Sequence, residues 1–387
     1  MNGLIEKIRS VMPDENGEID LSPLYPTEIG KYLSGMEATE QNPRYHAEGN
    51  VLNHTVRVLS ELCRSDGYKA EDEEGKLTLF LASLLHDIGK IATTRLDGGE
   101  WTSPRHTIAG AKMARELLWK AGLSGEPESL RLREAVCQLI RYHSYPPFCM
   151  SDNNDVKLHK IAANGALTDL FSLRKLITLE LADVYGRIGE SVSDMAEKVR
   201  YCEALSDELG ILDTPYSFTS DYAKRAYFKG RLAWRGGDIY CPDPFEVILM
   251  AGLPGTGKDT YIKKNFPTLP VVSLDEIRER IGVSPTENQA PVVEAAHNEA
   301  RALLRKRTPF VWNATSITAD LRSKQISLFE EYGASVRCVF LETSWEEELR
   351  RNRERERNVP ITVIEKMLSR LEVPEAFECE RVTWITV

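Results

Sequence analysis

Histidine and aspartate residues in the first half of the sequence are spaced in a pattern that could hold metal ions. Six of them are candidates: His54, His86, Asp87, His106, His143 and Asp183. Adjacent residues on a helix project about 100° apart, so His86 and Asp87 can both reach an ion at the helix edge. Imidazole and carboxylate ligands together suit Mn, Fe, Co, Ni or Zn. The pattern therefore predicts a divalent transition-metal site.

The remaining histidines receive a different interpretation. His46, His159 and His297 do not extend the pattern. A single histidine among apolar residues is more often a core residue with satisfied hydrogen bonds than a ligand. We therefore expect these three to be structural.

A glycine-rich loop follows the apolar segment FEVILMA and precedes a helical pattern. Glycines allow successive backbone N–H groups to converge on phosphates, and a lysine at this place reaches the β- and γ-phosphates of a nucleotide. The pattern predicts a nucleotide site formed by Gly252, Pro254, Gly255, Thr256, Gly257, Lys258, Asp259 and Thr260.

The residue after the lysine departs from the usual loop. A Ser or Thr commonly follows that lysine and ligates magnesium, whereas this chain has Asp259-Thr260. A carboxylate there would repel a triphosphate unless a magnesium ion lay between them. Either Asp259 holds the ion, directly or through water, or Thr260 takes that role.

The segment SLDEIR ends the next expected strand and offers a general base and a phosphate contact for phosphoryl transfer. Asp275 could accept the proton of an attacking hydroxyl, and Arg278, one turn later, could meet a phosphate of the acceptor. Asp275 could alternatively be a simple helix N-cap. Its position relative to the glycine loop favours catalysis.

An arginine-rich tract, RRNRERER over residues 350–357, has two interpretations. Charge runs on helices are usually solvated faces joined by ion pairs four residues apart. In small P-loop kinases, however, an arginine-rich lid follows the fourth strand, where this tract lies. Arg351 and Arg355 share one helical face and are the expected phosphate contacts, while Arg353 and Arg357 form the competing face.

Two kinds of sequence periodicity predict the helices and strands that position these residues. Helical patterns dominate residues 50–209, and strand–helix alternation begins at Phe245, which predicts a parallel sheet covered by helices. We expect an all-α domain over residues 1–210, an aromatic, Gly- and Pro-rich connector over 211–244, and an α/β P-loop kinase domain over 245–387.

Composition limits where the protein works and what it binds. The net charge of −10 argues against a broad basic face for duplex DNA and favours local recognition of nucleic-acid ends. The seven cysteines form no close Cys-x-x-Cys pair, no run reaches the roughly 20 apolar residues of a membrane span, and the start does not read as a secretory signal. We expect a cytoplasmic protein without a membrane partner.

Both groups of candidate site residues resemble those of known families. His54, His86-Asp87 and Asp183 match the HD phosphohydrolase superfamily, and His106 and His143 resemble the additional ligands of its two-metal members. The motifs GLPGTGKDT, SLDEIR and RNRERERNVP resemble the 5′-OH polynucleotide kinase of end-healing enzymes. Together they resemble the bacterial HD-Pnk family of RNA end-healing enzymes, over most of residues 50–360.

The resemblance implies roles for individual residues. Asp87 would bridge a first metal, held also by His54, His86 and Asp183, to a second held by His106 and His143. Lys90, Ser144 and Arg187 would contact phosphate, or be ordinary solvated or helix-end residues. Asp275 would be the general base, Arg278 the acceptor contact, and Arg351 or Arg355 the lid contacts. Lys258 and Asp259 would hold phosphate and magnesium. Asn313 and Thr315, at the end of the third strand, lie where acceptor contacts are expected, or they form an ordinary strand-end turn.

The expected function is repair of nucleic-acid ends. The kinase would phosphorylate 5′-OH ends from ATP or another NTP with Mg²⁺, and the HD domain would remove 2′-, 3′- or 2′,3′-cyclic phosphates with two divalent transition metals. RNA ends, or DNA ends, would be the substrates and an RNA ligase the functional partner. The alternatives are a metabolite kinase fused to a nucleotidase, and an HD hydrolase gated by NTP. Whether the chain forms a homodimer is left open.

Overall fold

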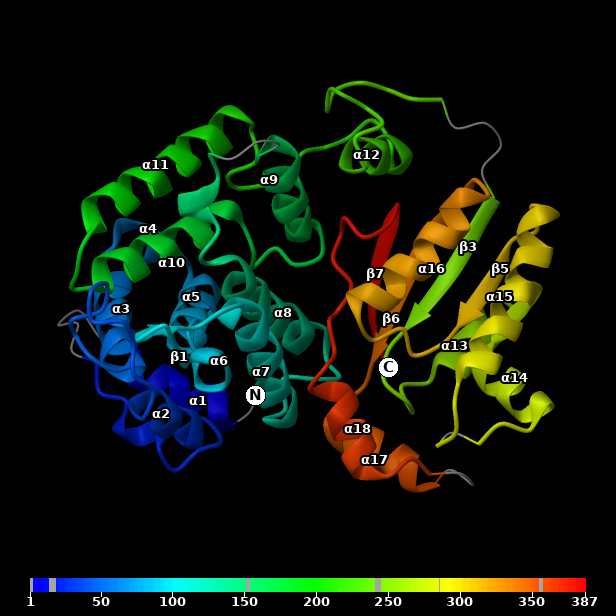
Figure 1. Ribbon diagram of the computed structural model, residues 1–387, viewed down its shortest axis with the longest axis horizontal. Coiled ribbons are helices and arrows are strands. Elements are labelled where there is room, and N and C mark those ends of the chain that lie inside the picture. The colour runs from blue at the N-terminus through cyan, green and yellow to red at the C-terminus, as the bar shows by residue number, and fades with distance from the viewer. Residues whose placement is uncertain (1–2, 14–18, 151–153, 241–244, 285, 355–357) are drawn as a thin grey trace. The chain divides into compact units, whose positions relative to one another are not determined.

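The computed structural model describes the chain except residues 1–2, 14–18, 151–153, 241–244, 285 and 355–357. The described chain divides into two compact units (Figure 1). The helical unit contains Met1–Ser124 and Glu128–Tyr216, and the α/β unit contains Gly125–Pro127 and Ser217–Val387. The hydrophobic core of each unit is built from its own residues.

The helical unit consists of α-helices with short 3₁₀ turns and one small hairpin. Its helices are α1 (Gly3–Val11), α2 (Gly30–Glu37), α3 (Val51–Arg64), α4 (Asp66–Lys69), α5 (Glu73–Leu85), α6 (Lys90–Thr93), α7 (His106–Lys120), α8 (Pro127–Tyr142), α9 (Asn154–Ala163), α10 (Leu173–Gly186) and α11 (Val192–Glu208). The 3₁₀ turns are η1 (Ser22–Leu24), η2 (Pro146–Phe148) and η3 (Asn164–Ala166). The hairpin is formed by β1 (Arg95–Asp97) and β2 (Glu100–Thr102).

Helix α5 lies inside the helical unit because it is apolar on every side. Its residues from Leu77 to Leu85 are all buried, as expected of a helix that other helices surround. Helix α10 packs against α3, α5 and α11. Asparagine or serine caps begin two of these helices: the Asn50 side chain accepts from the N–H of Asn53, and that of Ser172 from the N–H of Lys175. The sequence thereby fixes where α3 and α10 start.

The turn after α5 approaches the start of α7 unusually closely. A β-carbon added at Gly89 would lie 2.1 Å from the carbonyl oxygen of His106 and 2.5 Å from the nitrogen of Gly110. Only glycine permits this contact between backbones. The contact places the His86-Asp87 turn next to the first residue of α7.

The α/β unit is built on five parallel strands in the order β4-β5-β3-β6-β7. The strands are β3 (Phe245–Ala251), β4 (Val271–Ser273), β5 (Phe310–Asn313), β6 (Ala334–Glu342) and β7 (Arg381–Thr386). Strand β3 is central and almost wholly buried. This arrangement confirms the predicted fold class, a helical N-terminal unit followed by an α/β unit with a parallel sheet.

One helix of the α/β unit precedes the sheet, and the others follow its strands. They are α12 (Asp221–Phe228), α13 (Lys258–Asn265), α14 (Leu274–Ile281), α15 (Ala290–Arg305), α16 (Ala319–Glu331), α17 (Trp345–Glu354) and α18 (Ile361–Leu368). Helices α13, α15 and α16 pack on the sheet. Helix α12 comes from the segment expected as a connector, and its Arg225 is bound to Glu330 of α16 at 2.6 Å and to the carbonyl oxygen of Phe377. No helix within the described residues combines the length and apolarity needed to cross a membrane.

The glycine contact yields a stability prediction. Replacing Gly89 with alanine forces a β-carbon against the backbone of α7, so the free energy of unfolding of the helical unit should fall by about 1 to 3 kcal/mol. Thermal unfolding followed by calorimetry measures this. Gly3→Ala is the control, because an added β-carbon there meets nothing within 4 Å. Equal stability of the two variants would contradict the tight contact.

Candidate functional sites

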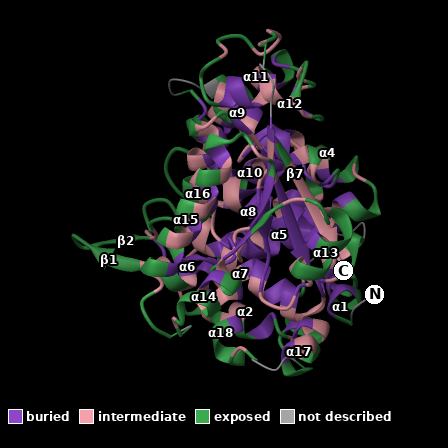
Figure 2. Cartoon of the chain, turned by 90° about the vertical axis from the view of Figure 1, so that its right-hand side faces the viewer, coloured by how far each residue is buried: buried purple, intermediate pink, exposed green. Residues whose placement is uncertain are grey.

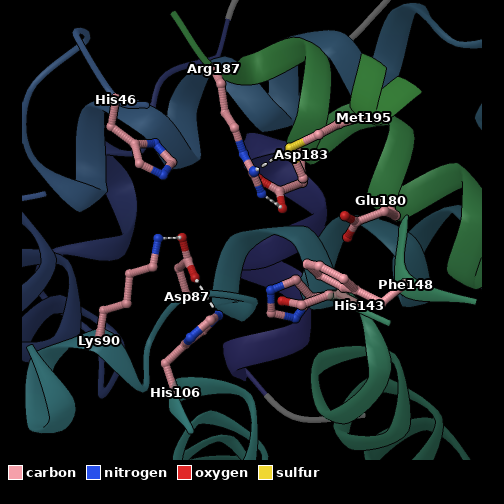
Figure 3. A pocket seen from close by; sticks show the side chains of 11 residues that line it. His46, Asp87, Lys90, His106, His143, Phe148, Glu180, Asp183, Arg187 and Met195 are labelled. Carbon is pink, nitrogen blue, oxygen red and sulfur yellow. Dashed lines mark hydrogen bonds and ion pairs between the residues drawn. The ribbon is translucent and has the colours of Figure 1, made fainter. Parts of the chain in front are cut away.

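All six predicted metal ligands of the helical unit converge on one region. They come from α3, the turn after α5, the start of α7, the residue after α8 and the last turn of α10. A cavity of about 250 Å³ opens beside them, here called the metal cavity (Figure 3). It is lined by His46, Asp87, Lys90, His106, His143, Ser144, Phe148, Glu180, Asp183, Arg187 and Met195.

The carboxylate of Asp87 lies between two groups of histidines. Its Oδ2 is 3.2 Å from Nε2 of His86 and 3.8 Å from Nε2 of His54, while its Oδ1 is 3.5 Å from Nε2 of His106. Two sets of ligand atoms, His54-His86-Asp87 and Asp87-His106-His143, each lie within 4.8 Å of one another. Asp87 belongs to both sets, which is the geometry that a bridging carboxylate requires.

Backbone carbonyls orient three of the imidazole rings. In each ring Nδ1 lies within hydrogen-bonding distance of a carbonyl oxygen three residues earlier, as seen for His86 with Ser83 (2.8 Å), His106 with Ser103 (3.0 Å) and His143 with Ile140 (2.8 Å). A carbonyl only accepts, so Nδ1 donates and the Nε2 lone pair is left for the cluster. Nε2 of His86 is buried and has no hydrogen bond among the described residues. This donor set fits divalent transition metals.

The charge states of the cluster also suit metal binding. Burial would raise the pKa of Asp87, but Lys90 and His86 hold that pKa well below its ordinary value. Burial acts on Asp183 in the same way, and Arg187 and His54 keep its pKa low. Burial lowers the pKa of His143 to about 3, so this ring is neutral. The cluster therefore offers ionised carboxylates and a neutral imidazole.

The three predicted phosphate contacts lie on the wall of the metal cavity. Nζ of Lys90 is 2.7 Å from Oδ2 of Asp87, and it also donates to Oε1 of Gln41 at 2.8 Å. Nη2 of Arg187 is 2.5 Å from Oδ2 of Asp183. Figure 3 shows both cations directed toward the carboxylates from opposite sides of the opening. Ser144 lines the same wall, so all three side chains can meet a ligand in the cavity.

His46, expected to be a structural histidine, has a hydrogen-bond partner and also faces the metal cavity. Its ring lines the metal cavity, and its Nδ1 is 2.8 Å from Oε1 of Glu48. The same oxygen is 2.9 Å from Nδ1 of His54. Burial would raise the pKa of Glu48, but hydrogen bonds from His46, His54 and the N–H of Ile188 hold that pKa below its ordinary value. Glu48 is therefore an ionised carboxylate that orients two rings.

Glu180 is a second residue of the metal cavity that the sequence analysis missed. Both of its carboxyl oxygens are buried without a hydrogen-bond partner among the described residues, and burial, followed by the charge of Asp183, raises its pKa well above the ordinary value. Glu180 precedes Asp183 by three residues on α10, so the two share a face. The three-residue spacing between Glu180 and Asp183 could have indicated from the sequence that Glu180 faces the metal cavity. His46 and Glu48 lie in a loop, where periodicity gives no signal.

The glycine loop of the α/β unit joins the central strand β3 to α13. Gly252, Gly255 and Gly257 all have positive φ, at 140°, 91° and 85°, which favours glycine at each position. The N–H of Gly252 donates to the carbonyl of Thr315, and the Thr256 hydroxyl donates to the carbonyl of Leu253. These hydrogen bonds fix the loop at both of these positions.

Lysine and aspartate flank the start of α13. Nζ of Lys258 donates to the carbonyls of Gly252 and Leu253, at 3.0 and 2.7 Å, so it folds back over the loop. Oδ1 of Asp259 accepts from Nδ2 of Asn313 at the end of β5, at 2.7 Å. This bond holds the Asp259 carboxylate at the edge of the sheet and favours it as the magnesium contact. Asp259 and Thr260 are both exposed on α13.

Asp275 and Arg278 lie on α14, directly after β4. Ser273 is the N-cap of α14, so the alternative role of Asp275 as that cap was wrong. Asp275 forms an ion pair with Arg278, and its side chain is 85% exposed. Nε of Arg278 also donates to Gln289 at 2.8 Å. The parallel strands β3, β4 and β5 end at one edge of the sheet, so the glycine loop, Asn313 and Asp275 share that edge.

The arginine tract is only partly described. Arg355 and Arg357, one from each competing face, lie outside the described residues. Nη1 of Arg351 would be 3.5 Å from a β-carbon at Gly257, so its guanidinium lies beside the glycine loop, where Nε donates to Glu347 at 2.6 Å. Asn352 bonds both the N–H and the carbonyl of Val359, which folds the chain back after α17.

A buried glutamate lies under the glycine loop. Glu348 is fully buried, and neither carboxyl oxygen has a hydrogen-bond partner among the described residues. Burial raises its pKa to about 8, although Lys258 opposes this shift. Glu348 therefore carries a proton at neutral pH. Glu348 precedes the arginine tract of residues 350–357, and no role was predicted for it from the sequence.

Two family models match the chain. The HD domain matches residues 51–187, and an AAA domain matches residues 247–374. The first match covers the elements that carry the histidine and aspartate cluster, and the second begins within β3 and includes the glycine loop. The chain is thus a fusion of a hydrolase-type HD domain and a P-loop kinase-like domain. This combination defines a bifunctional enzyme acting on nucleotides or nucleic acids.

The buried glutamate yields a pH prediction. Between pH 4.5 and 8 the folded protein holds a proton on Glu348 that the unfolded chain releases, so stability falls as pH rises through this window. Glu348→Gln removes this dependence. The variant should gain about 3 kcal/mol over the wild type between pH 5 and pH 8. Calorimetry at each pH measures this on the unfolding transition of the α/β unit. That transition is identified as the one that ATP with Mg²⁺ shifts.

Glu331→Gln is the matched control, because Glu331 is an exposed residue of the same unit. It should follow the wild type at every pH. A stability difference between Glu348→Gln and the wild type that does not vary with pH would contradict the buried, protonated state.

Proposed function

We propose that the chain is an end-healing enzyme of the HD-Pnk type. Its α/β unit phosphorylates the 5′-OH end of RNA or DNA, and its helical unit removes a 2′- or 3′-phosphate or opens a 2′,3′-cyclic phosphate. The two reactions prepare a broken strand for an RNA ligase, the expected functional partner. The exposed Asp275–Arg278 pair at the sheet edge of the glycine loop is the observation that carries this proposal.

In the kinase reaction the 5′-hydroxyl oxygen attacks the γ-phosphorus of an NTP, and the bond from that phosphorus to the β–γ bridging oxygen breaks. Asp275 accepts the hydroxyl proton, and an NDP leaves. Arg278 meets the phosphate next to the attacking nucleoside, a group that a polynucleotide has and a free nucleoside lacks. Lys258 and the loop N–H groups hold the NTP phosphates, with Mg²⁺ at Asp259.

In the hydrolase reaction water adds to the phosphorus, the bond to the sugar oxygen breaks, and that oxygen gains a proton. His54, His86, Asp87, His106, His143 and Asp183 would hold divalent metals, which would supply hydroxide near neutral pH and offset phosphate charge. Lys90, Arg187 and Ser144 bind the phosphate oxygens from the wall of the metal cavity. Glu48 keeps the rings of His46 and His54 in position.

Single substitutions should separate the two activities. Asp275→Ala should reduce phosphorylation of a 5′-OH oligonucleotide on the order of 100-fold or more, because the general base is lost, and leave phosphatase activity intact. His86→Ala should have the opposite effect, since it removes a metal ligand. An RNA with a 5′-OH and a 2′,3′-cyclic phosphate, supplied with Mg²⁺, Mn²⁺ and ATP, reports both reactions in one assay.

Each variant controls for the folding of the other, and Asp320→Ala, in an exposed ion pair with Lys324 on α16, controls for a surface change. Loss of both activities in either folded variant would contradict two separate sites. Phosphorylation of nucleosides instead of the oligonucleotide would favour the metabolite kinase. A hydrolase rate that depends on NTP, with no labelled acceptor, would favour the gated hydrolase.

A further inference from the structure

A second cavity of the helical unit, here called the side cavity, adjoins the metal cavity. It measures about 360 Å³, within the range of small-molecule sites. The two cavities share four lining residues: His46, Lys90, His106 and Arg187. Lys90 and Arg187 are the cations assigned to phosphate above. A phosphate bound at these cations is therefore at the border of the side cavity, and the group esterified to that phosphate can extend into it.

Two segments without helical structure form the far walls of the side cavity. The loop between α2 and α3 contributes Gln41, Asn42 and Tyr45, and strand β2 contributes Glu100, Trp101 and Thr102. Nδ2 of Asn42 donates to Oε2 of Glu100 at 3.4 Å and links the two walls. Every residue of β1 and β2 is exposed, and Figure 2 shows the hairpin projecting from the rest of the helical unit. The hairpin contributes little to the core of the unit.

Two aromatic rings are exposed on these walls. Tyr45 is 40% exposed and Trp101 is 36% exposed, although large aromatic side chains ordinarily gain stability from burial. Trp101 pairs across the hairpin with Leu96, which is 60% exposed, so the two share one side of the hairpin. Rings placed in this way offer flat apolar surfaces to a ligand.

Cations at the border and aromatic rings at the walls match the parts of a nucleotide. We propose that the side cavity binds the terminal nucleoside of the strand, with the base stacked on Tyr45 and Trp101 while its phosphate lies at Lys90 and Arg187. Base–aromatic stacking tolerates any sequence, because every base has a π face. A subsite of this kind suits an enzyme that must accept ends of every sequence. The inference rests on the proposed function and specifies how its hydrolase site recognises a nucleic-acid end.

Substrates with and without the terminal base test the subsite. Two RNA oligonucleotides ending in a 3′-phosphate are compared, one complete and one with an abasic last nucleotide, using the full chain with Mn²⁺. For the wild type, KM should be about 10-fold to 100-fold lower for the complete RNA than for the abasic RNA, the range that loss of a base stack implies. In Trp101→Ala and Tyr45→Ala this preference should fall toward 1. Binding of the same oligonucleotides, followed by fluorescence polarisation, should show the same ratios without turnover.

Tyr201→Ala is the matched control, because Tyr201 is a 47% exposed aromatic residue of α11 that lines neither cavity. It should keep the wild-type preference. Equal binding of the complete and abasic RNA by the wild type would overturn the proposal. So would a Trp101→Ala variant that weakens both substrates equally, because the hairpin would then have a structural role or bind something other than the base.

The subsite and the proposed function can fail separately. If wild-type enzyme heals RNA ends but ignores the terminal base, the subsite is wrong and the function stands. If the enzyme hydrolyses only free nucleoside 3′-monophosphates, and Trp101→Ala weakens them, the base site stands and the polynucleotide function falls.

Discussion

The carboxylate of Asp87 is the point on which the hydrolase site depends, because ligands from separate elements meet there. It is almost fully buried and lies within 4 Å of ring nitrogens of His54, His86 and His106 and of Nζ of Lys90. A buried carboxylate remains charged only when cations or hydrogen bonds compensate for the loss of water. The helices around it are therefore arranged as much by this charge as by their apolar faces.

The charges of the metal cavity nearly balance before any metal or substrate binds. Asp87 and Asp183 carry two negative charges, and Lys90 and Arg187 face them at 2.7 and 2.5 Å. Glu180 is neutral because of its raised pKa. Glu48 adds one negative charge beside His46 and His54. Divalent metals would add positive charge to this nearly balanced set, and a phosphate group would offset that charge. Under the proposed function, this local balance would allow an acidic chain, with a net charge of −10, to bind a polyanion.

Helical periodicity and loop motifs allowed the sequence to predict much of the fold and of both sites. His54, His86, Asp87 and Asp183 lie on or next to regular helices, where spacing determines which side chains can meet. The glycines around Lys258 carry a signal of their own, since their backbone conformation excludes most other residues. His46 and Glu48 had no such signal, because they lie in a loop whose course depends on packing. Strand β7 was missed as well: it follows a segment without regular structure, and only its pairing with β6 defines it.

The two sites also differ in how their residues are held, and this difference bears on their separation. Every ligand of the metal cluster belongs to the helical unit, and the glycine loop, Asp275 and Arg351 belong to the α/β unit. The first cluster is held by buried ion pairs and backbone carbonyls, whereas Asp275 is exposed and held by an ion pair with Arg278 alone among the described residues. Exposed ion pairs contribute little stability, so under the proposed function Asp275 would exchange its partner for a substrate hydroxyl at little cost. Buried pairs resist exchange, which suits ligands that must keep a metal in place through many reactions. Each unit thus positions its reactive groups by the means that its own chemistry requires.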